Sequence, residues 1–290
     1  MATEKSSYPS PFLHLEEVSF AYGKKRTVFK DFSLDIPQGQ TIGLLGKNGT
    51  GKSTLLYLMS GLLHPQHGKI MFAGNDVTKR MPETLQEIYL VPEEFMLPAI
   101  SMKQFVKTRA GFYPHFSHKL LEACLRDFDL HTDINLGELS MGQKKKALIC
   151  FALATNTSLL LMDEPTNGLD IPSKTQFRKV VASGMTDEKS IVISTHQARD
   201  IDSLLDHITI IDGTDVLLNQ HVQEITQRLL FAEQSMQQPT DEALFVQPST
   251  YGNSVILENK HHEESTLNLE LLFNATLAEK EKIQSIFNNL

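Results

Sequence analysis

The first third of the chain alternates between apolar and polar positions in a way that predicts β-strands. Strand patterns cover residues 12–20, 28–36 and 69–73, and a further short strand, Thr41–Leu45, leads directly into a glycine-rich segment. A helical pattern then runs from Ser53 to about Leu62. The glycine-rich segment therefore lies between a strand and a helix.

The middle of the chain has a helical pattern, and strand patterns return after it. The stretch from Met96 to Cys150 lacks strong strand signals, which predicts an inserted helical subdomain. Two continuous apolar runs, 158–162 and 190–194, are typical of central parallel strands, and a helix around 174–182 separates them. Residues 208–218 follow as a hairpin. This alternation predicts an open α/β sheet that binds its ligand at the carboxyl ends of the strands.

Composition places the chain among soluble globular proteins. It has 290 residues, 41% of them hydrophobic and 21% charged, and this length predicts two domains. Cys124 and Cys150 lie in apolar stretches, which favours buried, reduced thiols over a disulfide framework. We expect a cytoplasmic protein without a signal peptide or a membrane span, so that any membrane role requires a partner. The net charge of −8 argues against a nucleic-acid partner.

Residues 46–53 read Gly-Lys-Asn-Gly-Thr-Gly-Lys-Ser and match the phosphate-binding loop pattern in the strand–loop–helix context that it requires. Glycines let backbone N–H groups approach phosphate oxygens, and the following helix N-terminus adds partial positive charge. We expect Lys52 to contact the β- and γ-phosphates, Ser53 to bind Mg²⁺ and Thr54 to donate to a phosphate oxygen. The predicted nucleotide-binding residues of this segment are Gly46, Asn48, Gly49, Thr50, Gly51, Lys52, Ser53 and Thr54.

Three polar residues follow the two central apolar runs at the edge of the sheet where this loop opens. Asp163 and Glu164 are adjacent, and neighbouring carboxylates at a strand end point in different directions. We expect Asp163 to hold Mg²⁺ through water and Glu164 to orient or deprotonate the water that attacks the γ-phosphate. His196 would donate to that phosphate or hold the water and Glu164 in register. The predicted catalytic residues are therefore Glu164, His196 and Lys52.

A further segment, Leu139-Ser140-Met141-Gly142-Gln143, resembles the signature sequence of ATP-binding cassette (ABC) ATPases, usually Leu-Ser-Gly-Gly-Gln. Residues from about 12 to 220 resemble one such cassette because five of the family's motifs occur in order. They are the phosphate loop, the signature, Leu160–Glu164, Gly168–Asp170 and His196. The resemblance implies an α/β fold. It consists of a P-loop NTPase core with a mixed, mainly parallel sheet, an N-terminal antiparallel β-subdomain, the inserted helical subdomain and an α+β C-terminal extension.

The resemblance also implies ATP and Mg²⁺ as cofactors and a role for Tyr22, which would stack on the adenine base. In the family, the signature of one cassette closes over the nucleotide held by a second cassette, head to tail. Ser140, Gly142 and Gln143 would therefore act in trans, and Asp170 would link the two sites. The expected partner is a second copy of the chain or a homologous cassette.

Two positions depart from the family pattern. Met141 replaces the usual glycine of the signature, which we expect to change geometry more than chemistry. Glu93 stands where the family usually has a glutamine that touches the metal, in the loop between the core and the helical subdomain. We therefore expect Glu93 to be a metal ligand together with Ser53 and Asp163.

After Gln220 the chain becomes acidic, and residues 221–290 carry a net charge of −6. We expect residues 1–220 to form an ABC ATPase domain, with its helical subdomain at about 96–150, and 221–290 to form an accessory extension. Apolar residues between Leu267 and Phe287 predict a terminal amphipathic helix capped by Ser265 or Thr266. This helix would pack on its own domain, on a second copy or on a partner.

Taken together, the motifs predict the ATPase subunit of an ABC transporter, peripheral on the cytoplasmic face of the cell membrane and bound to separate integral-membrane subunits. Its tail weakly resembles those of single-cassette bacterial export systems, which favours export. The alternative is a soluble ABC ATPase that acts on ribosomes or DNA, although such proteins usually carry two cassettes or a coiled-coil insertion. A nucleotide sensor without activity is disfavoured because Glu164 and His196 are both present.

Overall fold

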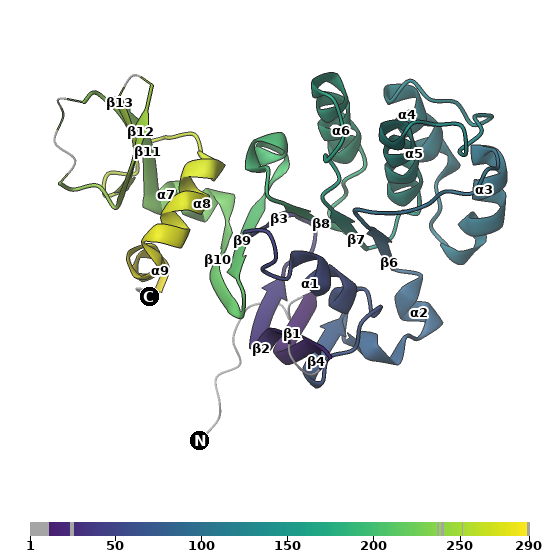
Figure 1. Cartoon of the computed structure of the whole chain (residues 1–290), viewed down its shortest axis with the longest axis horizontal. Helices are drawn as coiled ribbons and strands as arrows, with labels where there is room; N and C mark the ends of the chain where they lie inside the picture. The colour runs from purple at the N-terminus through teal and green to yellow at the C-terminus, as the bar shows by residue number, and fades with distance from the viewer. Residues whose placement is uncertain (1–11, 24–25, 237, 239–240, 251, 289–290) are drawn as a thin grey trace.

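A six-stranded sheet in the order β10-β9-β3-β8-β7-β6 forms the centre of the computed structural model (Figure 1). The structure describes residues 12–23, 26–236, 238, 241–250 and 252–288. Every neighbouring pair in this sheet is parallel except β9 and β10, so the sheet is mixed and mainly parallel, as predicted. Its strands are β3 (Thr41–Leu45), β6 (Ile88–Val91), β7 (Leu159–Asp163), β8 (Ser190–Thr195), β9 (His207–Asp212) and β10 (Asp215–His221).

An antiparallel sheet from the first part of the chain lies on the side of α1 (Lys52–Met59) that faces away from the central sheet. Buried Leu55 and Leu56 of α1 join a cluster that also contains Phe29 of the antiparallel sheet and Ile42 of the central sheet. The helix at the end of the phosphate loop is therefore held from both sides. The strands of this sheet are β1 (Leu13–Tyr22), β2 (Arg26–Ile36), β4 (His67–Phe72) and β5 (Asn75–Asp76).

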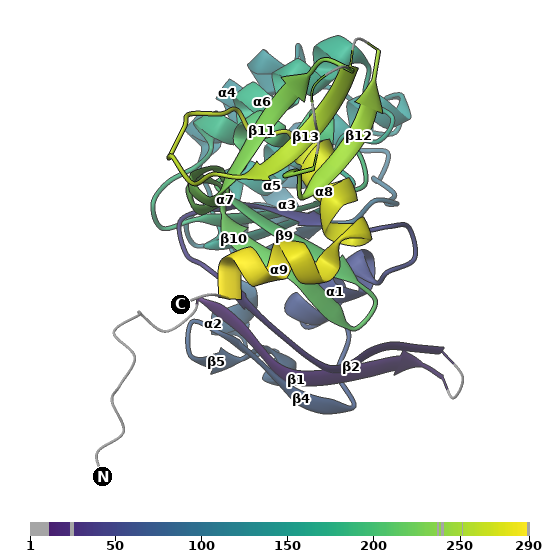
Figure 2. The same ribbon diagram turned by 90° about the vertical axis from the view of Figure 1, so that its left-hand side faces the viewer.

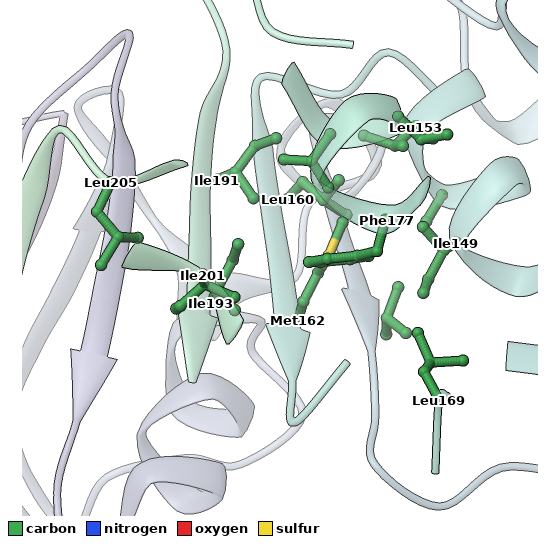
Figure 3. Packing of buried hydrophobic residues seen from close by; sticks show 14 of the residues in the cluster. Ile149, Leu153, Leu160, Met162, Leu169, Phe177, Ile191, Ile193, Ile201 and Leu205 are labelled. Carbon is green, nitrogen blue, oxygen red and sulfur yellow. The ribbon is translucent and has the colours of Figure 1, made fainter. Parts of the chain in front are cut away.

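Helices cover the opposite face of the central sheet, where Phe177 of α6 packs against Leu160 and Met162 of β7 (Figure 3). Strand β6 was not predicted, because its apolar run is short and Pro92 follows it directly. The helical elements up to β9 are η1 (Val77–Lys79), α2 (Pro82–Leu85), α3 (Met102–Arg109), η2 (Ala110–Phe112), α4 (His118–Asp127), α5 (Met141–Ala154), α6 (Ile171–Ser183), η3 (Ala198–Asp200) and η4 (Asp202–Leu204).

The described residues after β10 form a short helix, a three-stranded antiparallel sheet in the order β11-β13-β12, and two further helices (Figure 2). The prediction of one terminal helix capped by Ser265 or Thr266 was wrong. Non-helical backbone angles at Glu279 separate two helices, and the Asn268 side chain caps the first by accepting from the Leu271 N–H at 3.0 Å. These elements are α7 (Val222–Arg228), β11 (Leu229–Gln234), β12 (Phe245–Ser249), β13 (Gly252–Glu258), α8 (Leu269–Ala278) and α9 (Lys280–Asn288).

Residues 221–290, called the C-terminal extension below, share a hydrophobic core with the central sheet. Leu229, Leu269 and Ile283 of the extension belong to the same buried cluster as Ile193 of β8 and Leu218 of β10. The cysteines Cys124 and Cys150 are buried and form no disulfide, as expected of core residues. Among the described residues, no helix has the length and apolar composition needed to cross a membrane.

Candidate active site

The glycine loop connects β3 to α1 through backbone conformations that side chains would disturb. Gly51 has a φ of +105°, and a Cβ built there would lie 2.7 Å from Cγ1 of Val28. At Gly46, a Cβ would lie 2.7 Å from Oγ1 of Thr50 and 2.8 Å from the Ile211 carbonyl oxygen. The loop therefore packs too closely against β2 and β9 to accept side chains at these two glycines.

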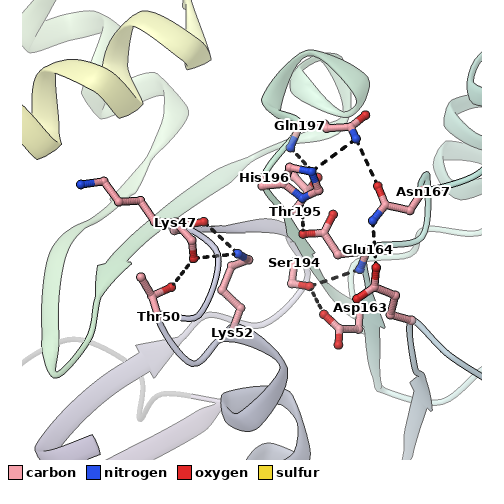
Figure 4. A network of polar contacts seen from close by, with 12 residues as sticks. Lys47, Thr50, Lys52, Asp163, Glu164, Asn167, Ser194, Thr195, His196 and Gln197 are labelled. Carbon is pink, nitrogen blue, oxygen red and sulfur yellow. Dashed lines mark hydrogen bonds and ion pairs between the residues drawn. The ribbon is translucent and has the colours of Figure 1, made fainter. Parts of the chain in front are cut away.

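The side chain of Lys52 is buried inside this loop (Figure 4). Its Nζ donates to the carbonyl oxygens of Gly46, at 2.8 Å, and of Lys47, at 3.3 Å. Burial lowers the pKa of Lys52, while the carboxylates of Glu164 and Asp163 oppose that shift. A buried ammonium thus lies among backbone carbonyls, close to the carboxylates across the pocket.

Asp163 ends β7 and Glu164 follows it, and both are almost fully buried, at 1% and 5% exposed. The Ser194 hydroxyl of β8 donates to the Asp163 carboxylate at 2.5 Å. The backbone turns at Glu164, whose φ of +44° is unusual for a residue with a side chain. The two adjacent carboxylates have different polar neighbours, Ser194 for Asp163 and His196 for Glu164.

His196 follows β8 and contacts Glu164 directly, with 2.8 Å between its Nδ1 and the Glu164 Oε1 atom. The other carboxylate oxygen of Glu164, Oε2, is buried and has no hydrogen-bond partner among the residues that the structure describes. A buried carboxylate oxygen is costly unless a ligand or water satisfies it. Glu164 therefore has one oxygen oriented by the imidazole and one free to accept a proton or a hydrogen bond.

Lys52, Glu164 and His196 line one pocket with a volume of about 390 Å³, whereas Gly46, Thr50 and Asp163 lie outside its lining. It brings together most of the predicted loop residues and the predicted Glu93, Glu164 and His196. Arg26 and Val28 at the start of β2 also line it, and the sequence analysis missed both. The only indication in the sequence that they lie near the nucleotide is that they follow Tyr22, the predicted adenine-stacking residue, by four and six positions. The lining residues are Arg26, Val28, Asn48, Gly49, Gly51, Lys52, Ser53, Thr54, Glu93, Glu164 and His196.

The predicted adenine-stacking residue, Tyr22, lies at the end of β1 beside the pocket. Its hydroxyl lies 3.2 Å from Oγ1 of Thr54, and its ring packs edge-on against Phe20. The side chain is 44% exposed and does not belong to the pocket lining. Tyr22 thus offers a partly exposed ring next to the phosphate loop.

The predicted signature residues lie outside this pocket, at the start of α5. Ser140 and Gln143 form a reciprocal cap. The Ser140 hydroxyl accepts from the Gln143 N–H at 3.3 Å, and the Gln143 side chain accepts from the Ser140 N–H at 3.1 Å. Both residues and Met141 are exposed, and a Cβ at Gly142 would lie 3.4 Å from the Gly168 carbonyl oxygen.

Asp170 is exposed and caps α6, because its carboxylate accepts from the Ser173 N–H at 2.9 Å. Hydrogen bonding to Ser173 lowers the pKa of Asp170. Like the signature, Asp170 does not line the pocket of its own chain.

A second set of polar contacts connects Glu93 to the His196 segment, through residues that the sequence did not single out. The Asn167 side chain donates to Glu93 at 3.0 Å and accepts from Gln197 at 3.2 Å. Lys145 of α5 donates to the carbonyl oxygens of Glu164, at 3.1 Å, and of Asn167, at 2.9 Å. Amides carry no motif of their own, so only the tertiary structure identifies this network.

The oxygen donors near the loop fit a small divalent cation. Mg²⁺ prefers oxygen ligands and is usually held by one or two carboxylates together with substrate phosphates. The Ser53 hydroxyl and the Asp163 and Glu93 carboxylates supply such donors. Within the described residues, no group of three or more His, Cys, Asp or Glu side chains could hold a metal without help. This donor set suits an ion that arrives with a nucleotide.

Comparisons with known proteins identify the family of this chain. A family model described as "ABC transporter" matches residues 29–167. The ABC transporter ATP-binding protein NatA of Bacillus subtilis is 30% identical over 213 residues, covering 70% of this chain and 87% of NatA. The Nod factor export ATP-binding protein I of Cupriavidus metallidurans is 29% identical, covering 69% of this chain and 68% of that protein. A solved ATP-binding subunit of an ABC transporter, 24% identical, superposes with a TM-score of 0.66 over 74% of this chain and 91% of that one.

Proposed function

The chain belongs to the ATP-binding proteins of ABC transporters, which are ATPases that drive transport, and we propose that it binds and hydrolyses ATP through the residues of the pocket. The proposal rests on the surroundings of the Glu164 carboxylate. One of its carboxylate oxygens is held by His196, and the other is buried without a hydrogen-bond partner in the described part of the chain. Glu164 and the adjacent Asp163 lie close to the Lys52 ammonium.

Nucleotide binding rests on the loop between β3 and α1. Its backbone N–H groups and the N-terminus of α1 provide a positive environment for phosphates. Lys52 would exchange its contacts with the loop carbonyls for the β- and γ-phosphates. Ser53, Asp163 and Glu93 would hold Mg²⁺, which when bound neutralises charge on the phosphate oxygens. Tyr22 would stack on the adenine.

Hydrolysis rests on the contact between Glu164 and His196. Oε2 of Glu164 would hold the attacking water and accept its proton, because it is the carboxylate oxygen without another partner. His196 would keep the carboxylate in this orientation through Oε1. The low exposure of Glu164 excludes competing water and strengthens both interactions.

A second copy of the chain, or a homologous cassette, would complete the site. Ser140, Gly142 and Gln143 lie at an exposed helix N-terminus outside their own pocket, where N–H groups suit a γ-phosphate bound by another subunit. Asp170, also exposed, would lie at the same junction. We therefore propose a head-to-tail dimer that two ATP molecules stabilise and hydrolysis loosens.

Separate membrane-spanning subunits would couple this cycle to transport, with the ATPase on the cytoplasmic face of the membrane. The names of relatives, such as the Nod factor export ATP-binding protein, support a transporter over an ATPase that acts on ribosomes or DNA, and favour export. Affinity purification from detergent-solubilised membranes tests this. Recovery of a multi-span protein is expected, whereas recovery of ribosomes alone would overturn it.

Substitution of Glu164 tests the catalytic proposal. Glu164→Gln keeps the shape of the side chain but removes the base, so we expect turnover to fall by about 10²–10⁴. ATP should still bind, and an ATP-dependent dimer should accumulate in size-exclusion chromatography with light scattering. Lys52→Ala, as the control, should lose ATP binding itself. Normal turnover in the Glu164→Gln variant would refute the assignment.

A further inference from the structure

The segment that follows His196 lies between the ATPase helix α6 and the C-terminal extension. On the α6 side, Lys174 pairs with Asp200, 2.7 Å from Nζ to Oδ2, and also donates to the Gln197 side chain at 3.2 Å. Arg178 donates to the Asp200 carbonyl oxygen at 3.1 Å. Three polar contacts thus attach one side of this segment to α6.

On the opposite side, the same segment meets α8 of the extension. Arg199, the neighbour of Asp200, forms an ion pair between its Nε and the Glu270 carboxylate. Glu270 lies in the first turn of α8. Ala198 is partly buried against the cluster that contains Leu269, also in that first turn. Adjacent residues of the segment therefore pair with two different helices.

The extension presents Glu270 from a fixed position. Leu269, Leu271 and Leu272 of α8 are at most 3% exposed and belong to the core that also contains Ile193 of β8. α8 contacts the three-stranded sheet on one side and β10 on the other (Figure 1). Moving the first turn of α8 would expose this core, so Glu270 is a stable anchor for Arg199.

The His196 side chain has few restraints of its own. It is 37% exposed, and its polar contacts within the described residues are Glu164 and the neighbouring Gln197. Its position therefore depends on the backbone that flanks it, which is the end of β8 at Thr195 on one side and residues 197–200 on the other. The latter are held by α6 and α8.

We propose that the C-terminal extension supports ATP hydrolysis by positioning this segment, with Glu270 and Arg199 as positioning residues that help to keep His196 against Glu164. This inference rests on the proposed function and assigns a role to the extension. The Arg199 side chain is 83% exposed and that of Glu270 is 42% exposed, so solvent screens the pair. This limits the expected effect on turnover to about fivefold.

Charge reversal in the full-length chain tests the proposal. Glu270→Arg and Arg199→Glu each place like charges opposite one another, so each should lower kcat about threefold to fivefold and leave the KM for ATP unchanged. The double variant restores an ion pair with reversed polarity and should recover kcat. Hydrogen exchange at the backbone amides of residues 197–201 should rise in the single variants and return in the double variant.

A second ion pair provides the matched control. Lys280 of α9 pairs with Asp215 of β10, with side chains 42% and 54% exposed, and this pair joins the extension to the central sheet at a place other than residues 197–200. Lys280→Glu should leave kcat and exchange at 197–201 unchanged. The proposal is overturned if the Arg199 and Glu270 variants match wild type in both measurements, if Lys280→Glu reproduces their effect, or if the double variant fails to recover. Failure of the proposed function is distinct, because Glu164→Gln would then keep its activity.

Discussion

Lys189 is a buried cation whose charge should make the stability of the protein depend on pH. Its side chain is 3% exposed, and its Nζ donates to the carbonyl oxygens of Gly184, at 2.9 Å, and of Leu153, at 3.5 Å. These carbonyls lie at the C-terminal ends of α6 and α5. Burial lowers the pKa of Lys189 from 10.5 to about 8.

The sign of the effect follows from the two pKa values. Between about pH 8 and 10.5 the folded chain has released the Lys189 proton while the unfolded chain still holds it, so the free energy of unfolding rises with pH. Below that window both states are protonated, and the buried charge costs about 3 kcal/mol. Raising the pH from about 7 to 9.5 should recover about 2 kcal/mol of this cost.

Urea denaturation of the full chain measures this contribution. Lys189→Met removes the titrating group, so the free energy of unfolding of wild type minus that of the variant should grow by about 2 kcal/mol between pH 7 and 9.5. Lys179→Met is the control, because Lys179 is also on α6 but 68% exposed. A difference between wild type and Lys189→Met that does not change with pH would refute the reasoning.

Two further substitutions test the phosphate loop and the α6 cap. Gly51→Ala should abolish ATP binding and lower the melting temperature, because its Cβ would lie 2.7 Å from Val28 and its φ is +105°. Gly49→Ala, with φ +82° and no described atom within 4 Å of its Cβ, should destabilise the fold only by about 1–2 kcal/mol of backbone strain, although its methyl group enters the pocket. Thermal shift without nucleotide compares the two losses of stability, and equal losses would contradict the packing argument; addition of Mg²⁺–ATP reports binding. Asp170→Ala should lower the melting temperature by a few degrees, whereas Asp170→Asn keeps the cap and should not. If Asp170→Asn still weakens the ATP-dependent dimer, the negative charge of Asp170 acts between subunits. If Asp170→Asn has the same melting temperature as Asp170→Ala, the cap assignment is wrong.

The parts of the site that a contiguous segment forms were predictable from sequence. Residues 46–53 carry both the glycines and the lysine of the loop, and the flanking strand and helix follow from hydrophobic periodicity. The meeting of Glu164 and His196 was also predictable, because both follow apolar runs, and parallel strands end at one edge of a sheet. The roles of these side chains in catalysis remain the proposal tested above.

Residues that act through long-range contacts were not predictable. Arg26 reaches the pocket only because β2 folds over the loop, and the Asn167 and Gln197 amides connect because two separate strand ends converge. Strand β6 was not predictable because an apolar run of four residues followed by a proline is too short to indicate a strand. The division of the terminal helical segment into α8 and α9 was not predictable either, because the spacing of apolar residues does not reveal the break at Glu279.

The sequence by itself determined the chemistry of this protein, because the phosphate loop, the paired acids and the signature are local patterns whose residue types suit one reaction. Only the tertiary structure decided that the C-terminal extension contacts the segment after His196. Packing of Leu269 and Leu272 into the core brings Glu270 to Arg199, 71 positions earlier in the chain. Such a contact depends on how two distant helices pack, and periodicity within each segment carries no information about it.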